Sequence, residues 1–324
     1  MKKVTIKDIA KELGVTVGTV SHALNGMSDI SEATKRRVIE TAKRMGYVSN
    51  IAAASLRSGK TKTVAAIVPD ISNPHIAYQI KLIEDKLKSL GYSVIILNTG
   101  EDENAERSAI ELAYSKQVDG IMLCPAQKTS SSISFLESIA IPYLLIGRYF
   151  SDIDTDFICA DDEKGGYLAG KYLVDKGYKK PIYIGAYKYI EASAKRFHGI
   201  SSAFIENGTK LTNERFLEIS PRADITKDSI RNLLDNAPDF DSIVAFSDVI
   251  AFEILSQLRA VGSGFVPVVG FDAINRHLSL PFRYASVGMT NGGWAEAAAE
   301  ALLDKIQNKA KCKTLIDVEL FESD

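Results

Sequence analysis

Residues 5–25 read TIKDIAKELGVTVGTVSHALN and predict two short helices joined by a turn. Thr5, followed three residues later by Asp8, is typical of a helix start, because each side chain can bind the other residue's backbone N–H group. Apolar residues then recur at the helical period: Ile6, Ile9, Ala10 and Leu13. Gly14 ends this first helix, since glycine readily adopts the left-handed backbone found at helix C-termini.

A second helix is expected to begin at Thr16, whose side chain can cap the free N–H groups of the first turn. Val20 and Leu24 face inward at helical spacing. The outer side carries polar residues that are able to meet DNA phosphates and base edges: Thr19, Ser21, His22 and Asn25. Two short helices at this spacing indicate a helix-turn-helix DNA reader.

A third amphipathic helix is expected from the Ser31 cap to Met45, and it adds basic side chains. Residues 1–60 contain 11 Lys and Arg against 5 Asp and Glu, a net charge of +6, whereas the rest of the chain carries −8. A basic head on an acidic body is typical of a phosphate-binding module. The alternative is an ordinary three-helix bundle with a solvated basic face, but helix lengths, turn spacing and charge all agree with DNA binding.

Length and composition suit a small head followed by a two-lobed body, because 324 residues exceed one ordinary core. The three cysteines, Cys124, Cys159 and Cys312, are far apart and lack metal-ligand spacing. We therefore expect thiols of a reducing compartment, with no metal site and no cofactor. The chain shows neither a secretory signal nor a membrane span, which predicts a cytoplasmic protein.

From Thr63 onward, short apolar runs alternate with helical stretches. Strands are expected at 64–68, 93–97, 120–124, 143–146, 182–185, 242–246 and 266–270. Helices are expected near 76–90, 103–117, 131–139, 163–176, 191–206, 224–235 and 248–260. Continuous apolar runs are typical of parallel strands that are covered on both faces. The pattern predicts two successive doubly wound α/β lobes.

No catalytic constellation accompanies these lobes. The glycines at 165–166 and 262–264 lack a phosphate-binding context, no Gly-x-Ser-x-Gly motif occurs, and the four histidines are scattered. We therefore do not expect an enzyme. Two α/β lobes that face one another form a cleft at the carboxyl ends of their strands, where a small ligand can bind.

Short motifs throughout the chain point to one known family. The head and the segment after it contain VTIKDIA at 4–10, TVSxxLN at 19–25, MGY at 45–47 and SLRSGKT at 55–61. The body contains PDISNP at 69–74, VDGI at 118–121, RxxG at 196–199, FSD at 246–248 and VGFD at 269–272. With these motifs the chain resembles the lactose-repressor (LacI/GalR) family of transcription regulators essentially from end to end.

The resemblance implies an all-α helix-turn-helix head that a hinge helix joins to a bilobal, periplasmic-binding-protein-like α/β body. The head takes residues 1–48, the hinge helix and linker 49–61, and the body 62–324. Within the body, the N-lobe takes about 62–160 plus 290–315, and the C-lobe takes about 161–289 plus the C-terminal strand. Such proteins are homodimers that read two half-sites of a palindromic operator. No heptad tail follows Phe321, so a dimer is expected rather than a tetramer.

The resemblance also implies which residues bind DNA. The base-reading positions are Val17, Gly18 and His22. The backbone-contact or capping positions are Thr5, Thr16, Thr19, Ser21, Asn25, Ser31, Thr34, Tyr47 and Asn50. In the hinge, Ala53 is a further DNA-binding position and Leu56 is the wedge that enters the central minor groove. The local alternative, less favoured than the wedge, is that Leu56 is an ordinary core leucine.

Two regions depart from the family's pattern. His22 stands where many relatives have Arg, and a neutral imidazole offers one donor and one acceptor instead of a guanidinium fork. In the hinge, Ser49 replaces the frequent Pro and Ala54 replaces the frequent Arg. The base preference at His22 and the freedom of the unbound hinge are therefore expected to differ from those of relatives.

The effector positions that the resemblance implies are His75, Cys124, Gly147, Arg148, Arg196, Ser247 and Asp272. We expect Arg196 and Asp272 on opposite walls of the cleft, where a guanidinium and a carboxylate can hold vicinal hydroxyls. Structural alternatives stay open, because Arg196 can pair with a carboxylate at the lobe edge and Asp272 can cap a turn. Asp248 is expected to be the N-cap of its helix.

The leading hypothesis is a homodimeric repressor of a carbohydrate-utilisation operon, whose operator binding responds to a sugar in the cleft. A purine, another metabolite or a protein partner is the alternative signal. A purine requires an aromatic wall beside Arg196, and Phe216 or Tyr187 is a candidate for it. A sugar-binding transport protein has a similar body, but the basic head and the lack of a secretory signal disfavour that class.

Overall fold

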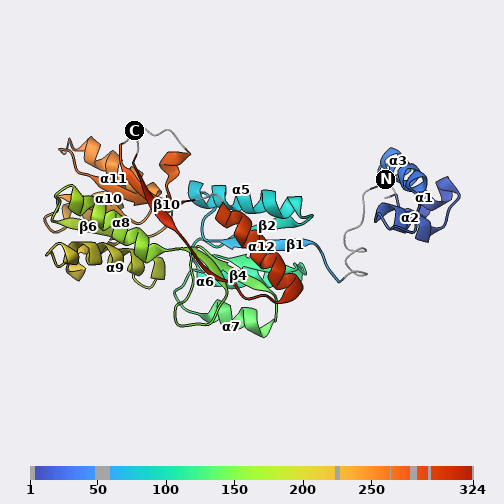
Figure 1. Cartoon of the computed structure of the whole chain (residues 1–324), viewed down its shortest axis with the longest axis horizontal. Coiled ribbons are helices and arrows are strands. Elements are labelled where there is room, and N and C mark those ends of the chain that lie inside the picture. Colours follow the sequence, from blue (N-terminus) through green and yellow to red (C-terminus); the bar gives the residue numbers. More distant parts are fainter. Residues whose placement is uncertain are drawn as a thin grey trace. The chain divides into compact units, whose positions relative to one another are not determined.

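The computed structural model describes residues 4–47, 59–222, 227–262, 264–277, 283–290 and 293–322. The chain divides into two compact units, residues 1–61 and residues 62–324 (Figure 1). The described part of the first unit is helical, and the second unit is built on two β-sheets. The prediction of a helical head and a bilobal α/β body is confirmed.

The helices of the first unit are α1 (Ile6–Leu13), α2 (Val17–Leu24) and α3 (Glu32–Arg44). The backbone N–H and the hydroxyl of Thr5 both donate to Asp8 Oδ2, at 2.8 and 2.7 Å. At the start of α2, Thr16 Oγ1 accepts a hydrogen bond from the Thr19 N–H at 3.0 Å. The local capping rules therefore place these helix starts where the sequence predicted them.

Small apolar side chains from all three helices form the core of the first unit: Ile9, Ala10, Val20, Ala23, Val38 and Ala42. Ser21 is buried beside them, with 7% of its surface exposed, so the expectation that it lies on the outer side of α2 is wrong. The reason is that α2 packs against both α1 and α3, which widens its buried face. His22 and Asn25 are exposed, as expected.

One sheet of the second unit, with its helices, forms the N-lobe. Its strands, from one edge to the other, are β11 (Lys313–Ile316), β5 (Phe157–Ala160), β4 (Tyr143–Ile146), β3 (Gly120–Leu123), β1 (Thr63–Val68) and β2 (Ser93–Asn98), all parallel. Its helices are α5 (Pro74–Ser89), α6 (Glu103–Ser115), α7 (Ser131–Ser138) and α12 (Gly293–Asn308). Alternate residues of the strands pack against α5 and α12 on one face and against α6 and α7 on the other.

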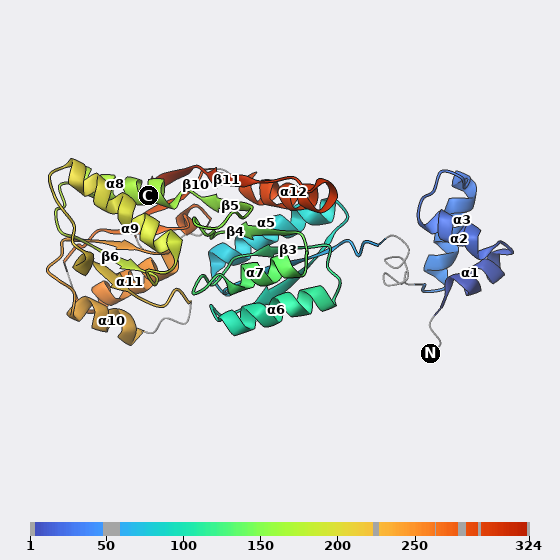
Figure 2. The same cartoon turned by 90° about the horizontal axis from the view of Figure 1, so that it is seen from below.

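The other sheet forms the C-lobe. Its strands, in spatial order, are β12 (Val318–Glu322), β10 (Ala285–Met289), β9 (Val268–Phe271), β8 (Ser242–Ala245), β6 (Pro181–Gly185) and β7 (Phe216–Glu218). Its helices are α8 (Asp162–Asp175), α9 (Glu191–Glu206), α10 (Lys227–Asp235) and α11 (Asp248–Ala260), with short 3₁₀ turns η1 (Asn213–Arg215) and η2 (Ile274–Arg276). The pairing is parallel except between β10 and β12. One face is covered by α8 and α9 and the other by α10 and α11 (Figure 2).

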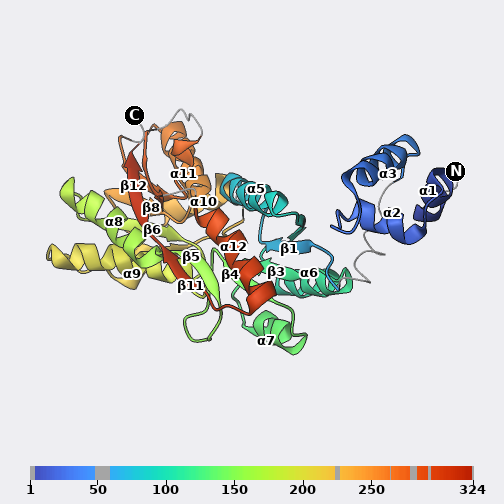
Figure 3. The ribbon, with the colours of Figure 1, turned by 45° about the vertical axis from the view of Figure 1, so that its right-hand side comes forward.

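The chain passes between the lobes after β5, after β10 and between β11 and β12 (Figure 3). Each lobe is therefore assembled from segments that are far apart in the sequence. The expected strands and helices are present with ends that differ by a few residues, but the helix α12 and the strands β5, β7, β10 and β11 were not predicted. The four strands are short, and β10 contains Ser286 and Gly288, which are weak strand formers.

The glycines at 165–166, which have no phosphate-binding context, have a packing role. A Cβ atom added at Gly166 would lie 2.0 Å from the backbone oxygen of Arg196. Only glycine therefore lets α8 approach α9 this closely, and this contact positions the start of both helices at the edge of the C-lobe.

Among the described residues, no helix has the length and apolar character that a membrane crossing requires.

Candidate functional site

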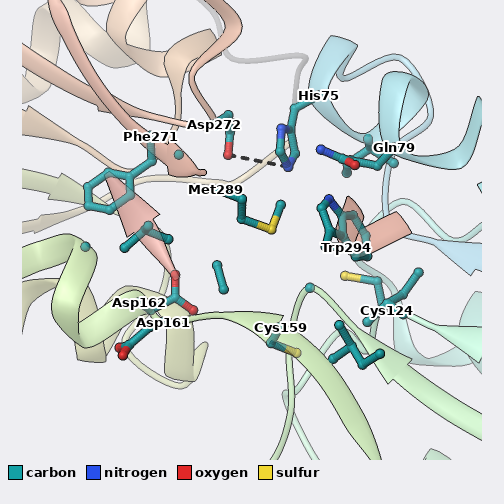
Figure 4. A pocket seen from close by; sticks show the side chains of 18 of the residues that line it. His75, Gln79, Cys124, Cys159, Asp161, Asp162, Phe271, Asp272, Met289 and Trp294 are labelled. Carbon is teal, nitrogen blue, oxygen red and sulfur yellow. Dashed lines mark ion pairs between the residues drawn. The ribbon is translucent and has the colours of Figure 1, made fainter. Parts of the chain in front are cut away.

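A cavity of about 120 Å³ lies between the two lobes, at the carboxyl ends of their strands (Figure 4). Much of its wall is apolar: Val68, Ile76, Ile80, Ile146, Phe271, Met289 and Trp294. A few polar and charged side chains interrupt this wall: His75, Gln79, Asp161, Asp162, Arg196 and Asp272. An apolar cavity with a few placed polar groups is typical of a site for a small ligand.

His75 and Asp272 face each other across the cavity, one from each lobe, and Figure 4 joins them by a dashed line. The distance from His75 Nε2 to Asp272 Oδ1 is 3.9 Å. His75 lies at the start of α5, where the Asn73 side chain accepts a hydrogen bond from the His75 N–H at 2.9 Å. Burial raises the pKa of Asp272, although His75 and Arg196 oppose that rise. A ligand in this cavity therefore meets a carboxylate that water solvates poorly.

Arg196, on α9, is held inside the C-lobe by several partners. Its Nε donates to Asp162 Oδ1 at 2.8 Å, and its Nη1 donates to the backbone oxygen of Phe246. Its guanidinium carbon lies 4.2 Å from the centre of the Phe271 ring. The structure therefore contains the ion pair between Arg196 and a carboxylate that was the structural alternative for this residue.

Arg196 and Asp272 do not lie on opposite walls, so that expectation is wrong. Arg196 comes from α9 and Asp272 directly follows β9, and both belong to the C-lobe. The physical reason is that the carboxyl ends of parallel strands and the helices that follow them meet at one edge of a sheet. The opposing wall belongs to the N-lobe, which contributes His75, Gln79 and Trp294.

Two polar atoms at the N-lobe wall are buried without a hydrogen-bond partner in the described structure. They are the indole nitrogen Nε1 of Trp294 and the side-chain oxygen Oε1 of Gln79. Trp294 itself is 7% exposed and belongs to the core cluster between α5 and α12. Buried polar atoms without a partner are uncommon, and a bound ligand is one way to satisfy them. Neither residue was predicted from the sequence.

Asp248 is not the N-cap of α11, contrary to expectation. The N-cap is Ser247, whose Oγ accepts a hydrogen bond from the Ile250 N–H at 3.4 Å. Asp248 is fully buried, and its Oδ2 accepts from the Ile274 N–H at 2.7 Å, while its Oδ1 accepts from the Ser286 hydroxyl at 2.7 Å. Asp248 is the first residue of α11, and its side chain points toward the core. It therefore supports the segment after β9, which contains Ile274.

The remaining predicted effector residues divide into two groups. Cys124 and Gly147 line the cavity, and burial raises the pKa of the Cys124 thiol to about 12. Arg148 and Ser247 are not among the residues that line it. Arg148 is buried and donates from Nη1 and Nη2 to Glu101, at 2.7 and 2.6 Å. The guanidinium of Arg148 is therefore paired with Glu101 and does not line the cavity.

The aromatic residues suggested for a purine wall lie elsewhere. Phe216 packs in the C-lobe core, with its ring centre 5.0 Å from that of Tyr183. Tyr187 stacks on Tyr189, with ring centres 5.3 Å apart, and neither residue lines the cavity. The rings of Phe271 and Phe246 meet Arg196 instead, with centres 4.2 and 4.8 Å from its guanidinium carbon, so the suggestion of Phe216 or Tyr187 was wrong. The distance along the sequence between Arg196 and each aromatic residue does not indicate which ring lies near the guanidinium in the fold.

In the head, most of the predicted DNA-binding positions are accessible. The exposed ones are Thr5, Thr16, Val17, Gly18, His22, Asn25 and Ser31. Thr19, Thr34 and Tyr47 are partly buried, and Ser21 is buried. The hinge positions Asn50, Ala53 and Leu56, with Ser49 and Ala54, lie outside the described residues. The three predicted base-reading positions, Val17, Gly18 and His22, are therefore all exposed on α2.

A helix-turn-helix head followed by a bilobal body with a ligand-sized cavity is the architecture of DNA-binding transcription regulators that carry a ligand-binding domain. Two family models match this chain. Residues 5–50 match "Bacterial regulatory proteins, lacI family", and residues 61–302 match "Periplasmic binding proteins and sugar binding domain of LacI family". The chain therefore belongs to the LacI family of DNA-binding transcription regulators, and the resemblance noted in the sequence is confirmed.

Individual relatives agree with this assignment. The HTH-type transcriptional regulator DegA of Bacillus subtilis is 31% identical over 83% of this chain and 82% of its own length. The HTH-type transcriptional repressor PurR of Mannheimia succiniciproducens is 27% identical over 97% of this chain and 95% of its own length. The solved Lac repressor dimer bound to operator and the anti-inducer ONPF has a TM-score of 0.83 at 18% identity, over 99% of both chains. These relatives are regulators and not enzymes.

Proposed function

We propose that this regulator is a homodimeric repressor of a carbohydrate-utilisation operon and that a sugar-like effector in the cavity modulates its binding to operator DNA. The observation that carries the effector proposal is the composition of the cavity. The rings of Trp294 and Phe271 lie beside a carboxylate, Asp272, and an imidazole, His75. Sugars bind through hydroxyl groups to charged side chains while their C–H faces pack on aromatic rings.

The unpartnered atoms of the N-lobe wall support the same ligand class. Trp294 Nε1 is a donor and Gln79 Oε1 is an acceptor. A hydroxyl group both donates and accepts, so a polyhydroxylated ligand satisfies both atoms without bringing a charge into an apolar cavity. The description of the matching body family as a sugar binding domain agrees with this proposal.

The DNA-binding proposal rests on the head. Its net charge of +6 over residues 1–60 suits phosphate contacts. The exposed face of α2 offers the side chains of Val17 and His22 to base edges, while Gly18, at the third base-reading position, has no side chain to contribute. A palindromic operator has two half-sites, so two heads and hence a homodimer are needed to read it. We assign residues 1–48 to the head, 49–61 with Leu56 as wedge to the hinge, and 62–324 to the body.

A thermal-shift screen of sugars and purines on the full chain tests the effector class. A ligand at 100 times its Kd is expected to stabilise the folded protein by about 2.7 kcal/mol. We expect a sugar to give this shift. Stabilisation by purines alone would contradict the sugar proposal and assign the cavity to the other class.

Titration calorimetry on two variants tests the site. Asp272→Asn and Trp294→Phe are each expected to weaken binding of the selected sugar about tenfold, because each removes one hydrogen-bonding partner and keeps the side chain's shape or ring. Tyr187→Phe is the matched control, since it removes a hydroxyl outside the cavity. Full affinity in both cavity variants would place the ligand elsewhere.

A further inference from the structure

One contact in the head bears directly on how α2 reads DNA. His22 lies on the exposed face of α2, and its Nδ1 is 2.6 Å from Oδ2 of Asp29, in the turn between α2 and α3. A carboxylate oxygen only accepts hydrogen bonds, so Nδ1 must carry the proton of this contact. In a neutral imidazole, Asp29 therefore places the single ring proton of His22 on Nδ1.

The consequence concerns the other ring nitrogen, Nε2. The two nitrogens lie on opposite sides of the imidazole ring, so Nε2 faces away from Asp29. In a neutral ring whose Nδ1 carries the proton, Nε2 is an acceptor. In the major groove, an acceptor pairs with the amino group of adenine or cytosine, whereas guanine presents acceptors at N7 and O6 and repels it.

We propose that Asp29 is a specificity-determining residue of this regulator: it holds His22 in the form that reads an amino-bearing base and rejects guanine. The proposal rests on the proposed function, in which α2 reads the operator. Asp29 itself needs no contact with DNA, because it acts through the imidazole. The motifs that identify the family do not include this residue.

The contact contributes little to the stability of the head. The side chains of His22 and Asp29 are 50% and 57% exposed, and exposed ion pairs of this kind stabilise a fold only weakly. Asp29→Ala is therefore expected to fold like the wild type. Without the carboxylate, the proton of a neutral ring is free to sit on Nε2, which then donates to guanine N7 or O6.

A matched control separates base reading from charge. Removing Asp29 also makes the head one unit more positive, which strengthens binding to all DNA. Glu12→Ala makes the same charge change at another exposed pair of the head, where Glu12 Oε1 accepts from Arg44 Nη2 at 2.8 Å. Any effect of charge alone is therefore common to both variants.

The experiment selects binding sites from a random pool of duplex DNA at about pH 8, above the range in which histidine ordinarily titrates. The wild type and Glu12→Ala are expected to enrich the same half-site, with one position that excludes guanine. Asp29→Ala is expected to lose about threefold to tenfold of its discrimination against guanine at that position only. Asp29→Asn, whose amide oxygen can still accept from Nδ1–H, is expected to retain most of it.

Three results would overturn the proposal. The first is an identical preference at every position for Asp29→Ala and the wild type. The second is a loss of preference that is spread over the whole half-site. The third is an equally large effect of Asp29→Ala in a His22→Ala background, where the imidazole is absent. If the wild type enriches no sequence at all, the proposed function itself fails, and this outcome is distinct from the other three.

Discussion

Asp248 supports the segment that contains Asp272, one of the charged residues of the cavity wall. Asp272 has φ 101° and the next residue, Ala273, has φ 50°, and both lie in the left-handed region that non-glycine residues rarely adopt. Asp248 accepts from the Ile274 N–H, while Ser286 Oγ accepts from the Ala273 N–H at 3.0 Å. These bonds hold the segment in its strained conformation, so Asp248 acts as a positioning residue for Asp272.

The protonation of Asp248 gives a testable pH dependence. Burial, and then the nearby charge of Asp272, raise the pKa of Asp248 well above its usual range. In the unfolded chain the group titrates near the ordinary value of about 3.9. Because the folded pKa is the higher one, its contribution to stability is full below the unfolded pKa and is lost as pH rises through the folded pKa.

Asp248→Asn removes this titration and keeps an oxygen that can accept a hydrogen bond. We expect the free energy of unfolding of the wild type, relative to that of Asp248→Asn, to increase as pH falls from about 7 to about 4. Urea unfolding of the two proteins across this pH range measures the difference. A difference that does not change with pH would contradict the raised pKa. Asp248→Ala leaves buried donors unpaired and should be less stable than Asp248→Asn by about 1–3 kcal/mol.

At the scale of elements, the close pair α8 and α9 sets the position of Arg196. Gly166→Ala would place a Cβ atom 2.0 Å from the Arg196 backbone oxygen, so the two helices must separate. We expect this variant to lose about 1–3 kcal/mol of stability by overpacking. Gly293→Ala is the control, because a Cβ there meets nothing within 4 Å and alanine favours the helix. Equal free energies of unfolding of the two variants in urea would show that the contact between α8 and α9 does not require glycine at position 166.

The same elements show what the sequence can and cannot predict. The starts of α1, α2 and α3 were predictable because capping residues lie within a turn of the helix that they cap. Gln79 follows His75 by four residues on α5, so the helical period gave a signal for it that was not used. No signal in the sequence marked Trp294 as a cavity residue or Asp162 as the partner of Arg196. Both depend on helices that long connections bring together.

At the scale of the whole body, polar contacts join the two lobes beside the cavity. Glu191 Oε1, on α9, accepts from the backbone N–H and the hydroxyl of Ser151 in the N-lobe, at 2.6 and 2.9 Å. Lys195, also on α9, donates to the hydroxyl of Tyr149 and lies 4.0 Å from the centre of its ring. Together with the His75–Asp272 pair, these contacts favour closed lobes. A ligand that binds both walls therefore acts on the equilibrium between open and closed lobes, which these side chains already shift toward the closed form.

The charge distribution of the whole molecule leads to a prediction about DNA binding. The basic head carries +6 while the rest of the chain carries −8, so attraction to phosphate must come from the head alone. If a dimer neutralises six or more phosphates, its affinity for duplex DNA is expected to fall by about 10³-fold or more between 50 and 200 mM salt, as condensed counterions are released. Fluorescence anisotropy with a labelled duplex measures this slope. The urea midpoint of the body, measured at both salt concentrations, excludes unfolding as the cause of the loss. An affinity that stays constant over this range would contradict a phosphate-binding head, because no apolar contact with DNA releases counterions.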